Sequence, residues 1–136
     1  MKILITGANG QVGMALQNVF STVYPIIALG HRECDIANKR AITNVFNRYQ
    51  PTIIINCAAY TAVDNAEKNF ELASAINAKG PDNIGQEAKR IGALVVHYST
   101  DYVFDGSKQG FYKEDDQPNP KSVYGKTKLA GELALQ

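Results

Sequence analysis

The sequence predicts an α/β fold built on a doubly wound parallel sheet. Four short apolar runs rich in Ile and Val are bounded by Gly, Pro or Asn, a pattern typical of parallel strands buried on both faces. These runs are Lys2–Thr6, Pro25–Leu29, Thr52–Asn56 and Ala93–Ser99. Segments with helical periodicity separate the runs, and this alternation implies right-handed crossovers within one sheet.

Apolar residues recur at helical spacing in three segments, Gln11–Phe20, Asn38–Tyr49 and Phe70–Ile91. We expect Asn38 to cap the second helix and Gly80-Pro81 to kink the third. Residues 105–121 are rich in Gly, Asp, Lys, Asn and Pro, which predicts a long surface loop. Ser122 is then expected to open a last helix.

The composition is that of a globular protein, and the 136 residues fit one domain. A net charge of +1 argues against nucleic acid or an anionic membrane as a partner. The two cysteines, Cys34 and Cys57, form no Cys-x-x-Cys pair, so neither a disulfide framework nor a metal site is expected. No apolar run is long enough for a signal peptide or a membrane span, and we expect a cytoplasmic protein.

A glycine-rich turn, Gly7-x-x-Gly10-x-x-Gly13, follows the first predicted strand and opens the first helix. In a dinucleotide-binding turn, the first glycine permits the tight turn, the second lets a pyrophosphate approach the backbone, and the third lets helix and strand pack closely. The helix N-terminus attracts the phosphate charge. The turn therefore predicts a Rossmann-like NAD(P)-binding domain over residues 1–136; the alternative is a purely structural turn between strand and helix.

The end of the second predicted strand is where such a site contacts the adenosine ribose. The sequence there is Gly30-His31-Arg32-Glu33, and Arg32 could pair with a 2′-phosphate, which favours NADPH over NADH. In the alternative, Arg32 is a solvated loop residue and Glu33 holds the ribose. Asp35 and Ile36 follow closely and are candidates to border the adenine.

A Tyr-x-x-x-Lys pair, Tyr124 and Lys128, projects from one face of the last predicted helix. An ammonium one turn away favours the ionised form of a phenol, so the pair is a candidate acid and base. Thr100 follows the fourth predicted strand, where ligands bind in doubly wound sheets, and is a candidate to polarise a substrate carbonyl. The alternatives are a solvated helix face and a hydroxyl that only satisfies the strand end. The order of glycine turn, hydroxyl and Tyr-x-x-x-Lys favours catalysis.

Small residues end the third predicted strand in the segment Asn56-Cys57-Ala58-Ala59-Tyr60-Thr61, and would let the backbone approach a cofactor. Asn77, in the third helix, is expected to bind a backbone carbonyl or an ordered water. Packing alone explains both features equally well. The two histidines have no metal-ligand spacing, and we expect His97, inside a strand, to be a hydrogen-bonded residue at or near the core.

Four stretches together resemble the extended short-chain dehydrogenase/reductase superfamily, and within it the dTDP-4-dehydrorhamnose reductases. They are GANGQVG, NCAAYTAVDNAE, HYSTDYVFDG and YGKTKLAGE. The resemblance covers essentially the whole chain. It implies reduction of the 4-keto group of dTDP-4-dehydro-L-rhamnose to dTDP-L-rhamnose by NADPH or NADH, for cell-surface polysaccharide such as lipopolysaccharide.

The resemblance also implies roles for individual residues. Tyr124 would give a proton to the sugar C4 oxygen, Lys128 would activate that phenol and anchor the cofactor ribose, and Thr100 would bind the same oxygen. Asp101 would contact the sugar, and Asp101-Tyr102 in place of the Asp-Glu pair of related dehydratases favours simple reduction. The remaining positions would bind the cofactor: Gly10, Gln11 and Val12 around the pyrophosphate, Asp35 and Ile36 on the adenine side, and Ala59, Tyr60 and Thr61 along its middle.

Members of that family are about twice as long as this chain and build the sugar-nucleotide pocket from a C-terminal half. We therefore expect a cofactor-binding domain without the substrate-binding lobe, and without the carboxylates proposed to bind Mg²⁺ at a dimer contact in the full-length family. Two alternatives stay open: a dinucleotide-binding regulatory subunit of the methionine adenosyltransferase type, and another nucleotide-sugar reductase or epimerase. The intact Thr100, Tyr124 and Lys128 favour an enzyme.

Overall fold

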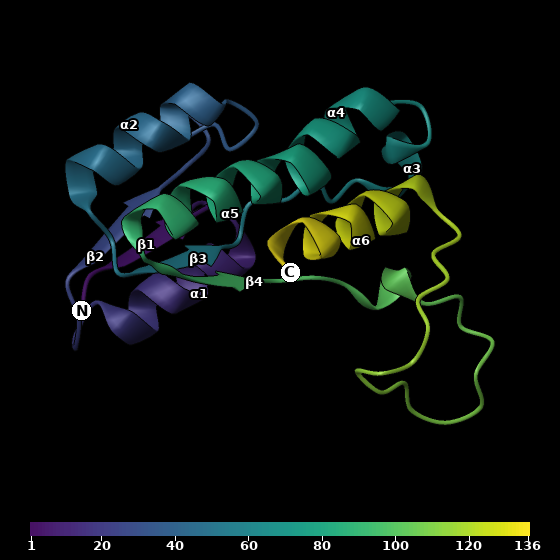
Figure 1. Ribbon diagram of the computed structural model, residues 1–136. Coiled ribbons are helices and arrows are strands. Elements are labelled where there is room, and N and C mark those ends of the chain that lie inside the picture. Colours follow the sequence, from purple (N-terminus) through teal and green to yellow (C-terminus); the bar gives the residue numbers. More distant parts are fainter.

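The computed structural model describes residues 1–136 as one parallel four-stranded sheet with helices on both faces (Figure 1). The strands lie in the order β2-β1-β3-β4. Their bounds are Ile3–Thr6 for β1, Ile26–Leu29 for β2, Ile53–Asn56 for β3 and Leu94–His97 for β4. The predicted doubly wound α/β fold is confirmed. Each strand begins one residue later than predicted, and β4 also ends earlier, at His97.

Helix α1 (Gln11–Phe20) covers one face of the sheet, and α2 (Lys39–Tyr49) and α5 (Gly80–Ile91) cover the other (Figure 1). Because side chains alternate along a strand, each strand contributes to both faces. The larger core lies under α2 and α5 and is formed around the fully buried residues Leu4, Ile42, Phe46, Ile54 and Ile84. A smaller cluster of Ile3, Ile5 and Ile55 lies under α1.

Strand β4 departs from the prediction that the strands are buried on both faces. Leu94 is 62% exposed and Val96 is 40% exposed. They pair with Ile53 and Ile55 of β3, which places them on the face that α1 covers. β4 is an edge strand, and α1 packs over β1 and β3 without covering it. Val95, on the opposite face, packs against the larger core.

The predicted helix caps are confirmed. The Asn38 side chain accepts a hydrogen bond from Ala41 N at 3.2 Å at the start of α2. Ser122 accepts one from Gly125 N at 3.0 Å and opens α6 (Val123–Leu135). Before α6, residues 105–121 form no helix or strand and extend away from the sheet as a long loop, as predicted (Figure 1).

The predicted third helix is divided into three pieces. They are α4 (Phe70–Ser74), a wider π-helical turn η1 (Ala75–Lys79), and α5, which has Pro81 in its first turn. Pro81 has no N–H to donate to the preceding turn, so the irregular turn precedes it. Two short helices were not predicted, α3 (Val63–Ala66) and the 3₁₀ turn η2 (Asp101–Val103).

Helix α6 packs closely against η1 and α5 because it carries a glycine at the contact. A Cβ atom at Gly131 would overlap the backbone carbonyl oxygen of Asn77 and would lie 3.1 Å from Pro81 Cγ. The backbone oxygen cannot move without displacing η1. At Gly85 of α5, by contrast, a Cβ would meet only the flexible end of Leu135, at 2.9 Å.

The two glycines therefore form a matched pair for a stability test. Alanine in place of a helical glycine normally stabilises by about 1 kcal/mol. We expect Gly131→Ala instead to lower the free energy of unfolding by about 1–3 kcal/mol, because α6 must shift away from η1. Gly85→Ala should leave it unchanged or raise it. Urea denaturation measures both, and equal stabilisation by the two substitutions would contradict the packing described here.

Candidate cofactor and catalytic site

A hollow of about 470 Å³ lies at the carboxyl ends of β1, β2 and β3. The chain crosses from one side of β1 to the other between β2 and β3, so the strand order reverses there, and doubly wound folds bind ligands at this point. Eight residues predicted as cofactor ligands line the hollow: Gly7, Gly10, Gly30, His31, Asp35, Ile36, Ala58 and Ala59.

The glycine turn shows why its positions need glycine. Gly7 has a φ of +66°, and a Cβ there would lie 2.5 Å from Ala58 N. A Cβ at Gly13 would overlap the carbonyl oxygen of Gly7, so α1 could not approach β1 as closely. Gly10 differs, because its nearest neighbour would be Gly7 O at 3.4 Å. Gly10 caps α1 without any side-chain hydrogen bond, which leaves the first N–H groups of the helix free for an anion.

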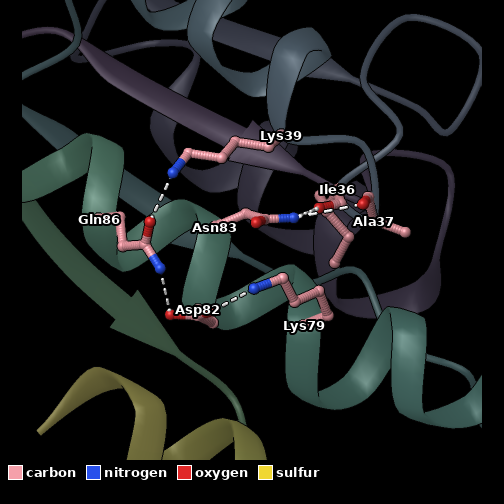
Figure 2. A network of polar contacts seen from close by, with 7 residues as sticks. All are labelled: Ile36, Ala37, Lys39, Lys79, Asp82, Asn83 and Gln86. Carbon is pink, nitrogen blue, oxygen red and sulfur yellow. Dashed lines mark hydrogen bonds and ion pairs between the residues drawn. The ribbon is translucent and has the colours of Figure 1, made fainter.

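A buried asparagine on α5 holds the loop that carries Asp35 and Ile36 (Figure 2). Asn83 donates through Nδ2 to Ile36 O at 3.1 Å and to Ala37 O at 3.3 Å. The Ile36 side chain packs where a Cβ of Gly80 would stand, so the loop is held by its backbone and its side chain. Nothing in the sequence pattern predicted this role for Asn83.

The surface around Asn83 is tied together by a chain of polar side chains (Figure 2). Lys79 Nζ contacts Asp82 at 2.7 Å, Gln86 donates to the same carboxylate at 2.7 Å, and Lys39 donates to Gln86 at 2.7 Å. Because Lys39 belongs to α2, these contacts fasten α2 to α5. The loop that carries Asp35 and Ile36 is therefore anchored to two helices that are fastened to each other.

Some predicted cofactor residues lie outside the wall of the hollow. Arg32 is exposed and makes no hydrogen bond or ion pair, while its neighbour His31 lines the hollow. The others are Gln11, Val12, Gly13, Tyr60, Thr61, Tyr124 and Lys128. Conversely, the sequence analysis missed Asn9, Cys34, Leu72 and Ile76, which line it together with Cys57 of the predicted Asn56–Thr61 segment. Leu72 and Ile76 are one turn apart, and this spacing marked them only as core residues.

Burial keeps the two thiols at the hollow protonated. Burial raises the pKa of Cys34 to about 11, with Asp35 adding to the effect, and burial raises the pKa of Cys57 to about 11 as well. Both thiols are therefore uncharged at neutral pH, and a thiolate is the reactive form. No group of three or more His, Cys, Asp or Glu side chains could hold a metal ion, and no helix is both long and apolar enough to cross a membrane.

The predicted catalytic residues are gathered where α6 meets the end of β4. On α6, Tyr124 is 9% exposed and Lys128 is 2% exposed. Lys128 Nζ donates to Tyr98 O at 2.5 Å, and no hydrogen bond joins it to the Tyr124 hydroxyl. Burial lowers the pKa of Lys128 to about 8, against the opposing charge of Glu132.

Thr100 and Asp101 begin the turn η2 after β4. Thr100 Oγ1 accepts from Tyr102 N at 3.2 Å and contacts Asp101 Oδ1 at 3.2 Å. The hydroxyl thus caps η2, as the structural alternative for Thr100 expects. The ring of Tyr102 packs edge-on against Tyr124 at 5.6 Å between centroids, so η2 and the Tyr-x-x-x-Lys helix are in direct contact.

Asn77 joins the two parts of the site. Its Oδ1 accepts from Tyr60 N at 2.8 Å, and its Nδ2 donates to Tyr60 O at 3.0 Å. The same Nδ2 donates to Thr127 Oγ1 at 3.2 Å, and Thr127 lies between Tyr124 and Lys128. The expected contact with a backbone carbonyl is confirmed. Asn77 is 1% exposed, so this bridge from the β3 loop to α6 is shielded from water.

A row of polar side chains crosses the ends of three strands. Thr6 Oγ1 donates to Asn56 Oδ1 at 2.6 Å, and Asn56 Nδ2 lies 3.0 Å from His97 Nδ1. His97 Nε2 lies 3.4 Å from Lys128 Nζ. The prediction that His97 is hydrogen bonded at or near the core is confirmed. Burial, with a further effect of the Lys128 charge, lowers the pKa of His97 to about 4.

The half-buried His97 makes stability depend on pH. Its pKa is about 4 when folded against an ordinary 6.5, so the unfolded chain binds more protons between these values and stability falls as pH falls from 6.5 to 4. We expect the free energy of unfolding to drop over this window by up to about 3 kcal/mol more in the unsubstituted protein than in His97→Leu. Urea denaturation at several pH values measures this. His31 is exposed, so His31→Gln should keep the original slope, and identical slopes in all three proteins would contradict the prediction.

The doubly wound sheet, the glycine turn at its switch point and the buried Tyr-x-x-x-Lys helix define a Rossmann-like domain of the short-chain dehydrogenase/reductase class. The chain belongs to the RmlD substrate binding domain family, whose model matches residues 1–136. The suspected resemblance is thus confirmed at the level of the family.

Several relatives support this placement. The dTDP-4-dehydrorhamnose reductase of Burkholderia thailandensis is 42% identical over 135 residues, which cover 99% of this chain and 45% of that protein. The crystal structure of a dTDP-4-dehydrorhamnose reductase from Clostridium acetobutylicum superposes with a TM-score of 0.97 at 47% identity, covering 99% of this chain and 49% of that one. A reductase of the same name from Bacillus anthracis, solved in complex with NADP, has a TM-score of 0.96 at 42% identity, covering 98% and 48%. The chain spans about half the length of the curated relatives it matches.

Proposed function

We propose that this chain is the cofactor-binding half of an NADPH-dependent dTDP-4-dehydrorhamnose reductase that works in the cytoplasm. The observation that carries the proposal is the Asn77 bridge, because it places the helix of Tyr124 and Lys128 beside the loop that lines the cofactor hollow. The reductases named above support the same reaction. We assign residues 1–136 to NAD(P) binding and expect the sugar-nucleotide lobe in the second half of the full-length protein.

The residues of the hollow fit a dinucleotide. The uncapped start of α1 and the open space at Gly10 suit a pyrophosphate, which Gln11 and Val12 would also contact through the backbone. Asp35 and Ile36 would border the adenine. Other residues support these contacts: Gly7 and Gly13 shape the turn, Gly30, His31 and Arg32 surround the ribose end, and Ala58, Ala59, Tyr60 and Thr61 lie along the middle of the cofactor.

The residues near the end of β4 would then carry out the reduction of the substrate carbonyl. A bound reduced nicotinamide supplies a hydride to the substrate carbonyl carbon. The Tyr124 hydroxyl gives its proton to the carbonyl oxygen, and the Thr100 hydroxyl donates a hydrogen bond to the same oxygen. Asp101 contacts the sugar of the dTDP substrate, and Lys128 anchors the cofactor ribose. A homodimer and a bound Mg²⁺ remain expectations for the full-length protein.

Cofactor binding is measurable on this chain by the fluorescence of the reduced nicotinamide. We expect saturable binding, with NADPH tighter than NADH by about 10–100-fold, the contribution of a hydrogen bond to a charged group. Arg32→Ala should remove the difference, while Gly10→Ala should fold normally and bind neither cofactor. Tighter binding of NADH than of NADPH would indicate that Glu33, and not Arg32, contacts the ribose. No binding of either would show that the isolated half does not hold a formed site.

Catalysis needs the full-length protein. There, Tyr124→Phe should lower kcat by about 10²–10⁴-fold, because the proton donor is lost, while the Kd for NADPH changes little. Tyr49→Phe, on α2 away from the site, is the matched control and should keep full turnover. Unchanged turnover in Tyr124→Phe would contradict the assignment. Cofactor binding without turnover in the unsubstituted protein would favour the regulatory-subunit alternative.

A further inference from the structure

Lys128 is buried in surroundings that do not favour its charge. The side chain is 2% exposed, and no carboxylate lies within ion-pair distance of Nζ. Its hydrogen-bond partner is Tyr98 O, and the other polar atom in reach is His97 Nε2, at 3.4 Å. A buried ammonium without a counter-ion is destabilised. Whether His97 turns a hydrogen or a lone pair toward Nζ therefore affects the charge state of Lys128.

The orientation of Asn56 determines which nitrogen of His97 carries the proton. The backbone N–H of Ala58 can only donate, and it points at Asn56 Oδ1 at 3.2 Å, where Thr6 Oγ1 also donates. Oδ1 is therefore the acceptor end of the amide. The other end, Nδ2, carries hydrogens and faces His97 Nδ1 at 3.0 Å. Nδ1 must accept this bond and is unprotonated.

The neutral imidazole then carries its hydrogen on Nε2, the nitrogen that faces Lys128. We propose that His97 is a positioning residue, held by Asn56 in the Nε2–H form so that it donates to Lys128 Nζ and favours the uncharged amine. An ammonium would set donor against donor across the 3.4 Å gap, whereas an amine has a lone pair to accept the bond.

The lowered pKa values of both groups agree with this arrangement. Glu132 on α6 acts in the opposite direction, because its carboxylate favours the ammonium, although it also accepts a hydrogen bond from Ser99. Four charged side chains of η1 and α5 form two pairs, Lys79 with Asp82 and Glu87 with Arg90, and Lys89 of α5 makes no ion pair. The remaining titratable groups nearby are Cys57 just after β3, Tyr98 just after β4, Asp101 and Tyr102 on η2, and Tyr124 and Lys126 on α6.

The consequence for chemistry rests on the proposed function. Once Tyr124 has given its proton to the substrate oxygen, the phenolate must be reprotonated. No hydrogen bond joins Lys128 Nζ to the Tyr124 hydroxyl, so a proton from Lys128 would reach the phenolate through an intervening hydroxyl or water. Lys128 would then become an amine, which the His97 Nε2–H stabilises until solvent returns a proton to it. The row of polar side chains from Thr6 to His97 would thus make the Lys128 ammonium lose its proton more readily.

The test measures which nitrogen of the His97 ring is protonated. This measurement needs no turnover, so its result is independent of whether the proposed function is correct. Long-range ¹H–¹⁵N correlation spectra of the labelled chain at pH 7.5 distinguish the two ring nitrogens of each histidine. The chain has two histidines, and His31→Gln assigns the signals. We expect His97 to show Nε2 protonated and Nδ1 unprotonated. An Nδ1–H ring, or an equal mixture of the two forms, would overturn the proposal.

Two substitutions test the cause. Asn56→Asp replaces the donating amide by an acceptor, so we expect the ring to switch to Nδ1–H. The new carboxylate favours the Lys128 ammonium by its charge alone, so the readout is the protonated nitrogen of the ring and not the Lys128 titration. Thr6→Val removes one bond to Asn56 Oδ1 but leaves that of Ala58 N, so it should keep the Nε2–H form. A ring that stays Nε2–H in a folded Asn56→Asp protein would show that Asn56 does not set it.

Discussion

The register of the parallel sheet is the constraint on which the rest of this structure depends. It pairs Thr6 with Asn56 and Asn56 with His97, so the last residue of three neighbouring strands is polar and all three lie at the same edge. The strands before them are apolar and bury the core. A slip of one residue would place these polar groups among Ile and Leu side chains on the wrong faces, so core packing also aligns the polar edge.

Three buried asparagines hold the loops at that edge of the sheet in place. Asn56, Asn77 and Asn83 are each 1% exposed, and each bonds the backbone of a loop that leaves the sheet. Asn56 accepts from Ala58 N, Asn77 takes both polar groups of Tyr60, and Asn83 donates to two carbonyls after Cys34. Hydrogen-bonded buried amides favour a single arrangement of their neighbours, and the one buried side-chain polar atom left without a partner is Asn83 Oδ1. Asn77 and Asn83 thereby hold loops that lie 17 and 47 positions away in the sequence, whereas Asn56 holds the loop that directly follows its own strand.

The hollow and the helix that carries Tyr124 and Lys128 lie at the same edge of the sheet. The glycine turn and the loop after β3 form the hollow, while α6 brings Tyr124 and Lys128 to the end of β4. Gly131 allows α6 to approach η1 closely, and Asn77 connects the two through Thr127. Stability and the proposed catalysis therefore draw on the same contacts.

Local patterns in the sequence determined the elements of this protein. Periodicity predicted the strands and the main helices, Asn38 and Ser122 marked helix starts, and the glycine turn and Tyr-x-x-x-Lys pair marked the site, because each depends on residues close together in the chain. Only the tertiary structure decided which face of β4 stays open, that Asn83 holds the loop of Ile36 and Ala37, and that His97 reaches both Asn56 and Lys128. The contacts of Asn83 and His97 join residues 31 to 47 positions apart, and the exposure of β4 depends on which helix covers it. No pattern of neighbouring residues in the sequence indicates such contacts. Distance in sequence is thus the physical reason for the division: propensity and capping act within a few residues, whereas burial and polar pairing are settled when the elements pack.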